Sequence, residues 1–219
     1  TAGYVVRDPA HHQKIFEGPI GAEMFQRVSE KMDITVLSTL YLGTRQLNLR
    51  EPRNVRTPVD LKGVKLRMPG TKEWLFLGQA LGATATPLAF GEVYLGLKTG
   101  TIDAQDNPLP TIRAAKFHEV LTGHLVDGLF LAVSNKVWKS LSPGQQQRMR
   151  QAAQASARYN NDNRLKEESQ LVDYFRQQGL QIQTPDVPAF RASVQQAYLQ
   201  SEYARVWPLG LLERINALR

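Results

Sequence analysis

Two arginines lie near the predicted ends of strands, where a guanidinium can bind an anion. Arg67 belongs to the alternating stretch Val64–Met68, one residue before the strand's predicted last position and a Pro-Gly stop. Arg45 follows Gly43 and Thr44 at the end of an apolar stretch. Open α/β sheets tend to bind ligands at such ends, and a guanidinium pairs with a carboxylate through two parallel hydrogen bonds. The pattern indicates either a carboxylate-binding site or, as the alternative, surface ion pairs.

Three further side chains are candidates for the same site. Asn107 falls in a predicted turn made rigid by Pro108, from which its amide adds a neutral donor. Trp74 and Phe90 have the spacing of residues that line either a core or a pocket wall, and core packing alone explains each. If Trp74 lies near Arg67, its ring limits the size of the pocket.

The residues that most often carry catalysis or bind metals lack their usual spacing. The chain has 4 histidines and no cysteine, and it contains no HExxH, GxSxG or glycine-rich phosphate motif. His118 and Glu119 are adjacent, and a structural role is the preferred interpretation of that pair. We therefore expect no catalytic residue, no metal and no cofactor, which favours a binding protein over an enzyme.

The positive charge raises a different class of partner. With 27 Lys and Arg against 20 Asp and Glu, the formal net charge is +7. Arg45, Arg50, Arg53 and Arg56 lie close together, but the residues between them are not aromatic, and a solvated basic loop is the preferred interpretation. A nucleic-acid- or acidic-surface-binding protein is the alternative function, although we expect no nucleic acid as partner.

The predicted elements indicate an α/β architecture. The expected strands are 34–41, 64–68, 101–103 and 180–183, and the expected helices are 20–28, 71–81, 92–99, 142–178, 190–203 and one ending near 218. The helix from Ser142 has a proline at its first position and a capping-box Gln145, and about 36 residues give it a length of roughly 54 Å. We expect it to be a strut along two lobes. The longest apolar run, Leu129–Val133, is too short to span a membrane.

Several motifs, in the same order along the chain, resemble the solute-binding proteins of tripartite ATP-independent periplasmic (TRAP) transporters, the DctP-like family. They are 43–46, 57–69, 83–94, 100–109 and 116–120. The resemblance covers nearly the whole chain. One motif departs from the family pattern, because residues 103–108 read Asp-Ala-Gln-Asp-Asn-Pro where the family usually has Asp-Gly-Gln-Glu-Asn-Pro.

The resemblance implies a two-lobed periplasmic receptor that closes on a small organic acid, such as a dicarboxylate or a sugar acid. It implies that Arg67 clamps the ligand carboxylate, that Arg45 and Asn107 also contact it, and that Phe90 lies at the pocket. It also implies delivery to a TRAP membrane permease. We expect a monomer.

The resemblance also suggests how the chain is divided. We expect 1–44 and 131–178 to form what is present of the first lobe, with the long interlobe helix. We expect 45–130 and 179–219 to form the second lobe and the C-terminal helices. Family chains open with a signal peptide and further elements of the first lobe, so the N-terminal part of that lobe is expected to be missing here.

Overall fold

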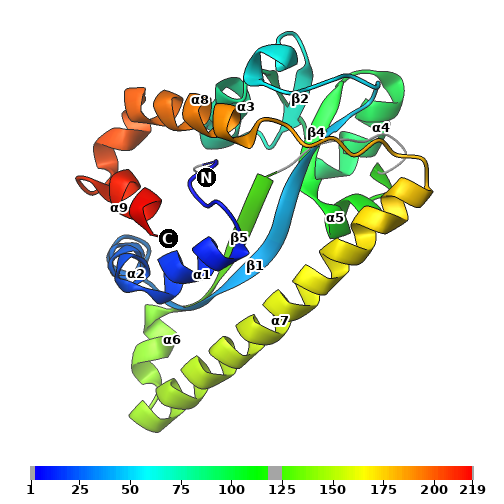
Figure 1. Cartoon of the computed structure of the whole chain (residues 1–219). Coiled ribbons are helices and arrows are strands. Elements are labelled where there is room, and N and C mark those ends of the chain that lie inside the picture. The colour runs from blue at the N-terminus through cyan, green and yellow to red at the C-terminus, as the bar shows by residue number, and fades with distance from the viewer. Residues whose placement is uncertain (1–2, 118–124, 219) are drawn as a thin grey trace.

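A computed structural model of the chain describes residues 3–117 and 125–218. Within these residues, five strands form one sheet in the order β3-β2-β4-β1-β5, and helices cover both of its faces (Figure 1). The strands are β1 (Ile34–Leu49), β2 (Lys65–Met68), β3 (Thr84–Pro87), β4 (Ala104–Pro108) and β5 (Leu125–Ser134). The helices are α1 (Pro9–Glu17), α2 (Pro19–Met32), α3 (Lys72–Ala80), α4 (Val93–Thr99), α5 (Leu109–Ala114), α6 (Asn135–Ser140), α7 (Pro143–Gln177), α8 (Val187–Gln200) and α9 (Leu211–Ala217). Short 3-10 helices are η1 (Pro58–Leu61), η2 (Phe90–Glu92) and η4 (Glu202–Val206).

Strand β1 joins the two ends of the sheet. Its first part pairs antiparallel with β5 up to Arg45, and its last part, Arg45–Leu49, pairs antiparallel with β4. Strand β2 pairs parallel with both β4 and β3. The sequence predicted this strand only to Tyr41, so Arg45 lies within a strand and not at its end. The residues after Tyr41 include polar side chains, and the strands with which they pair lie far away in the sequence. A hydropathy pattern along the sequence does not show such pairing, so it does not predict this part of the strand.

Other stretches also differ from the prediction, and the expected strand at 101–103 is wrong, because β4 begins only at Ala104. The expected turn at Asp106–Pro108 is wrong, because Ala104–Pro108 forms the buried strand β4, with its proline at the last position. The expected strand at Leu180–Gln183 is also wrong, since that segment is irregular and leads from α7 to α8. Leu125–Ser134 forms β5, a strand that the sequence did not predict.

The long helix is confirmed. Helix α7 has 35 residues, and its capping box is complete: the Ser142 hydroxyl accepts from the Gln145 amide at 3.3 Å, and the Gln145 side chain accepts from the Ser142 amide at 2.8 Å. Gly179, with φ of +83°, follows its end. The helix lies along β1 and packs against it and α5 (Figure 1).

Three apolar clusters hold the elements together. One lies between the sheet and helices α3 and α8, a second lies among α4, α5 and α7, and a third joins α1, α2 and α9. The first two clusters cover the two faces of the β2–β4 end of the sheet, which carries the candidate site. Among the described residues, no helix is both long enough and apolar enough to cross a bilayer.

A histidine latch connects α1 to α9. The buried His11 ring accepts a hydrogen bond from the Arg7 amide through Nδ1 at 3.1 Å, so its Nε2 carries the proton and donates to the Ile215 carbonyl at 2.9 Å. The Arg7 guanidinium donates to the carbonyls of Asn216, at 2.9 Å, and Leu218. Segments near the two ends of the chain are thereby joined.

This latch makes stability depend on pH. Burial lowers the pKa of His11 below its ordinary value; the Ile215 carbonyl and Asp8 oppose this effect, and the charges of Arg7 and Arg191 add to it. A lowered folded-state pKa gives stability that is present above the ordinary pKa and is lost as the pH falls through the folded-state value. We expect the melting temperature to fall between about pH 7 and about pH 5, and to fall less in His11→Gln. Equal pH slopes in thermal melts of both proteins would contradict this assignment.

Candidate functional site

Arg45 is held by a buried carboxylate. Leu47 faces Asp106 across the β1–β4 ladder, so Arg45 and Asp106 are diagonal neighbours on one face of the sheet. The Arg45 Nε and Nη2 donate to the Asp106 Oδ1 at 2.9 and 2.7 Å, and Nη2 also donates to the Asp106 carbonyl at 2.7 Å. Arg45 is only 6% exposed and Asp106 only 4%. The pair is therefore an interior ion pair.

Arg45 also contributes to a cavity wall. The Trp74 ring of α3 lies against its guanidinium, with Arg45 Cζ 4.7 Å from the ring centroid. Both residues line a cavity of about 640 Å³, together with His12 and mostly apolar side chains of α1, α2 and α9. Arg45 thus presents a charged group at a mostly apolar wall, which also includes Arg27 and Lys31.

Arg67 is buried without a carboxylate. It is 5% exposed, its Nε donates to the Leu88 carbonyl at 2.8 Å, and its Cζ lies 5.9 Å from the Phe90 ring centroid. No carboxylate among the residues that the structure describes forms an ion pair with it. Burial lowers the pKa of Arg67, the positive charge of Arg45 lowers it further, and Asp106 acts in the opposite direction. A guanidinium nevertheless stays protonated.

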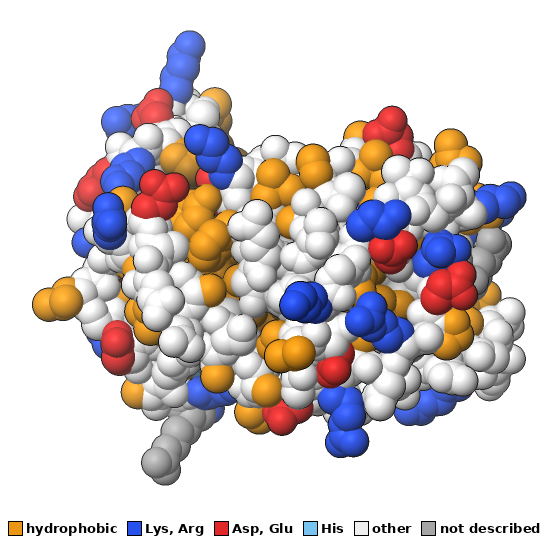
Figure 2. Space-filling model, turned by 90° about the horizontal axis from the view of Figure 1, so that it is seen from above, with side chains coloured by type: hydrophobic (Ala, Val, Ile, Leu, Met, Phe, Trp, Pro, Cys, Tyr) orange, Lys and Arg blue, Asp and Glu red, His pale blue; other side chains and the backbone are white. Residues whose placement is uncertain are grey.

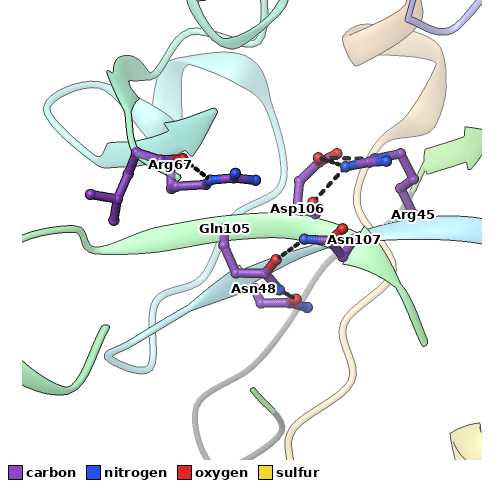
Figure 3. A network of polar contacts seen from close by, with 7 residues as sticks. Arg45, Asn48, Arg67, Gln105, Asp106 and Asn107 are labelled. Atoms are coloured by element: carbon purple, nitrogen blue, oxygen red, sulfur yellow. Dashed lines mark hydrogen bonds and ion pairs between the residues drawn. The ribbon is translucent and has the colours of Figure 1, made fainter. Parts of the chain in front are cut away.

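Both arginines lie near the carboxylate of Asp106. Figure 3 shows the guanidinium groups of Arg67 and Arg45 pointing toward Asp106 from opposite sides. Two cations and one carboxylate leave a positive charge in a region that is nearly closed to water. Such an arrangement can bind one anionic group.

Asn107 belongs to a network of amides. Its Nδ2 donates to the Gln105 Oε1 at 2.5 Å, and the Gln105 Nε2 donates to the Asn48 Oδ1. Because successive strand residues point to opposite faces, Asn107 and Asp106 face away from each other, as Figure 3 also shows. Asn107 is not among the residues that line the cavity. A ligand contact by Asn107 stays a prediction.

The structure decides between the alternatives for the arginines. Surface ion pairs are wrong for both Arg45 and Arg67, and a solvated basic loop is wrong for Arg45, whereas Arg53 and Arg56 are exposed. Phe90, predicted at a pocket, lies beside Arg67 and is 48% exposed. Neither Phe90 nor Arg67 is among the residues that line the cavity next to Arg45 and Trp74.

Three residues of the site were missed by the sequence-based prediction. Asp106, Gln105 and Asn48 were not predicted as site residues, and the alternating amides of β1 and β4 were the available signal for the last two. His118 and Glu119 lie outside the described residues.

Known proteins resemble this chain over most of its length. Residues 2–204 match the family model for bacterial extracellular solute-binding protein, family 7. The sialic acid-binding periplasmic protein SiaP of Vibrio cholerae is 34% identical over 200 residues, which cover 89% of this chain and 62% of that protein. The chain thus spans less than two thirds of this curated relative.

Solved structures agree with the fold. A TRAP periplasmic solute-binding protein from Roseobacter denitrificans, with bound 3-deoxy-D-manno-oct-2-ulosonic acid, is 46% identical with a TM-score of 0.92, and the match covers 100% of this chain and 74% of that one. A second protein from that organism, with bound L-galactonate, is 30% identical with a TM-score of 0.82, and the match covers 99% of this chain and 72% of that one.

Proposed function

Since this chain belongs to family 7 of the bacterial extracellular solute-binding proteins, we propose that it acts as a periplasmic receptor for a small organic acid. In this proposal Arg67 clamps the ligand carboxylate, Arg45 is a second contact, and the chain catalyses no reaction and needs no cofactor. The loaded receptor, a monomer, delivers the acid to the membrane subunits of a TRAP permease.

One observation carries the proposal: Arg67 is buried beside the Arg45–Asp106 pair and has no carboxylate partner among the described residues. A cation without a counter-charge is costly to keep away from water. A ligand carboxylate offsets that cost, and a bidentate pair in surroundings of low dielectric constant is stronger than one at a surface. The single excess positive charge matches a ligand with one carboxylate.

We further propose a 2-ulosonic acid as the ligand. The relative that is 46% identical was solved with 3-deoxy-D-manno-oct-2-ulosonic acid, and SiaP is named for sialic acid, which is also a 2-ulosonic acid. In these compounds the carboxylate adjoins a ring carbon. The rings of Trp74 and Phe90, each beside one arginine, offer apolar faces near the bound carboxylate.

A ligand screen tests this function. We expect 3-deoxy-D-manno-oct-2-ulosonate to raise the melting temperature by several degrees, since a ligand at about 100 times its dissociation constant adds about 2.7 kcal/mol. N-acetylneuraminate and L-galactonate are the comparison acids, and D-mannose, which has no carboxylate, is the negative control. The proposal fails if no acid shifts the melting temperature more than mannose does.

The nucleic-acid alternative rests on the net charge alone. Figure 2, which views the molecule from above, shows Lys and Arg interspersed with Asp and Glu over this face, without a continuous basic patch. Several basic side chains are paired with acids, among them Arg50 with Glu51 and Lys65 with Asp103. Filter binding of DNA at two salt concentrations distinguishes the functions, because a phosphate-binding surface gives tight binding that falls steeply with salt.

Closure of two lobes is part of the proposed mechanism. In the proposed division, into 1–44 with 131–178 and 45–130 with 179–219, Arg45 and Arg67 both belong to the second lobe. A ligand shifts an open–closed equilibrium only by its differential affinity for the two states. We expect 3-deoxy-D-manno-oct-2-ulosonate to reduce the radius of gyration in solution scattering, while D-mannose leaves it unchanged. Identical profiles with the acid and with mannose would contradict closure.

A further inference from the structure

Strand β1 carries a bulge just before Arg45. Between the pairs that Tyr41 and Gly43 form with β5, β1 contains one extra residue, Leu42. Gly43 has φ of +132°, a conformation that favours glycine, and a Cβ atom there would lie 2.8 Å from Glu168 Oε1. The bulge and its glycine are therefore packed directly under the side chain of Glu168.

The bulge determines which way Arg45 points. In a regular strand Tyr41, Gly43 and Arg45 would all face the same side of the sheet, the side covered by α7. With the extra residue, Tyr41 and Thr44 share the α7 side, where Tyr41 Oη and Thr44 Oγ1 are 2.7 Å apart. Arg45 then faces the other side, toward Trp74 and the cavity. Bulges are known to re-aim side chains in this way.

Glu168 of α7 holds the bulge. Its Oε2 accepts from the Tyr41 hydroxyl at 2.6 Å, and its Oε1 accepts from the Thr44 backbone amide. An earlier turn of the same helix also holds Tyr41, because Asn161 accepts from the Tyr41 amide at 2.8 Å and Asn160 donates to the Tyr41 carbonyl at 2.9 Å. Of these residues, only Glu168 bonds on both sides of Gly43.

We propose that Glu168 is a positioning residue for ligand binding, because it fixes the Gly43 bulge in the form that aims Arg45 at the cavity. Glu168 lies on the α7 side of the sheet, away from the cavity, so it acts through the strand and not by contact with the ligand. The inference rests on the proposed function, in which Arg45 contacts the ligand carboxylate.

The energetics of Glu168 support this role. Burial raises its pKa, while hydrogen bonds from Tyr41 and Thr44 and the charge of Arg164 oppose the rise, and Glu167 adds to it. A raised folded-state pKa means that the ionised carboxylate costs stability at neutral pH. A carboxylate that is kept at a cost to folding is expected where binding requires it.

The first test compares neighbouring acids. We expect Glu168→Ala to weaken the binding of 3-deoxy-D-manno-oct-2-ulosonate by about 10-fold in calorimetry, as for loss of a hydrogen bond to a charged group. The matched control is Glu167→Ala, which removes an adjacent acid that forms an ion pair with Arg164 and should leave the affinity unchanged. Tyr41→Phe, which removes one donor and keeps the ring, should give a smaller loss. Equal affinities for wild type, Glu168→Ala and Tyr41→Phe overturn the inference.

The conservative variant separates geometry from charge. In Glu168→Gln, the amide oxygen accepts from the Thr44 amide and the amide nitrogen donates to Tyr41 Oη, whose own hydrogen turns to Thr44 Oγ1. Glu168→Gln should therefore restore most of the affinity and melt no lower than wild type at neutral pH. If Glu168→Gln binds as weakly as Glu168→Ala, the carboxylate acts by charge and the positioning role is wrong.

A double-mutant cycle links Glu168 to Arg45. In an Arg45→Ala background, Glu168→Ala should cost no further affinity. An equal cost in both backgrounds overturns the inference while the proposed function stands. If Arg45→Ala alone leaves the affinity unchanged, Arg45 is not a ligand contact and the part of the proposed function on which the inference rests fails.

A readout without ligand completes the test. Hydrogen exchange of the Arg45 Nε–H, which is bonded to Asp106, should become faster in Glu168→Ala and not in Glu167→Ala. Unchanged exchange in Glu168→Ala overturns the inference even if no acid is found to bind.

Discussion

Arg67→Ala is expected to weaken the binding of 3-deoxy-D-manno-oct-2-ulosonate by roughly 30-fold to several thousand-fold. Removing one partner of a buried, hydrogen-bonded charge pair typically costs about 2–5 kcal/mol, at about 1.4 kcal/mol for each factor of ten. The guanidinium is 5% exposed, and its Nε is already used by the Leu88 carbonyl, so the two terminal nitrogens are the groups left to a ligand. Titration calorimetry measures the change.

The controls for this prediction distinguish shape from charge. Arg67→Lys keeps the positive charge but offers a single ammonium, so it should also bind weakly. Arg53→Ala removes a guanidinium from the exposed 51–57 loop and should bind as wild type does. Wild-type affinity in both Arg67 variants would exclude Arg67 as the clamp.

Asp106→Ala is expected to cost about 3–5 kcal/mol of folding stability, because it leaves the buried Arg45 without its counter-charge. In a protein of this size each kcal/mol lowers the melting temperature by about 2–4 °C. The contrast is Asp173→Ala, whose carboxylate is 72% exposed and pairs with Arg176 at the surface. That substitution should change the melting temperature little. Thermal melts of the two variants measure the difference.

A compensating pair makes the reason for the loss testable. Arg45→Met combined with Asp106→Leu removes both charges and keeps the volume, and such replacements are often neutral or stabilising. We expect the double variant to regain most of the stability that Asp106→Ala loses while it binds the acid poorly. If it is as unstable as Asp106→Ala, the loss comes from packing and not from the unpaired Arg45.

The sequence predicted those features whose causes are local. The α/β class and the periplasmic-binding-protein fold are confirmed by the solved relatives, and the long helix is confirmed together with its Ser142 cap. Arg67 was placed correctly, on the strand that ends at Met68, because a short alternating stretch and a Pro-Gly stop define it. Each of these signals lies within a few residues of the feature that it predicts.

The rest of the site depends on contacts that no local pattern shows. Arg45 and Asp106 are 61 residues apart in sequence and meet only through the β1–β4 register. The amides of Asn48, Gln105 and Asn107 satisfy one another inside the sheet, so a segment that is polar in sequence forms a buried strand. Glu168 gave no signal at all, because its role comes from an irregularity in a distant strand. The lobe boundaries stay a prediction.

The latch between His11 and Ile215 has a consequence for synthesis. These residues are 204 positions apart, so α1 obtains this partner only after the whole stretch from α1 to α9 has been synthesised. Contacts of such long separation slow folding and leave apolar surface uncovered in the meantime. The contact between α1 and α9 therefore cannot form early, and α1 stays accessible to chaperones until α9 has left the ribosome.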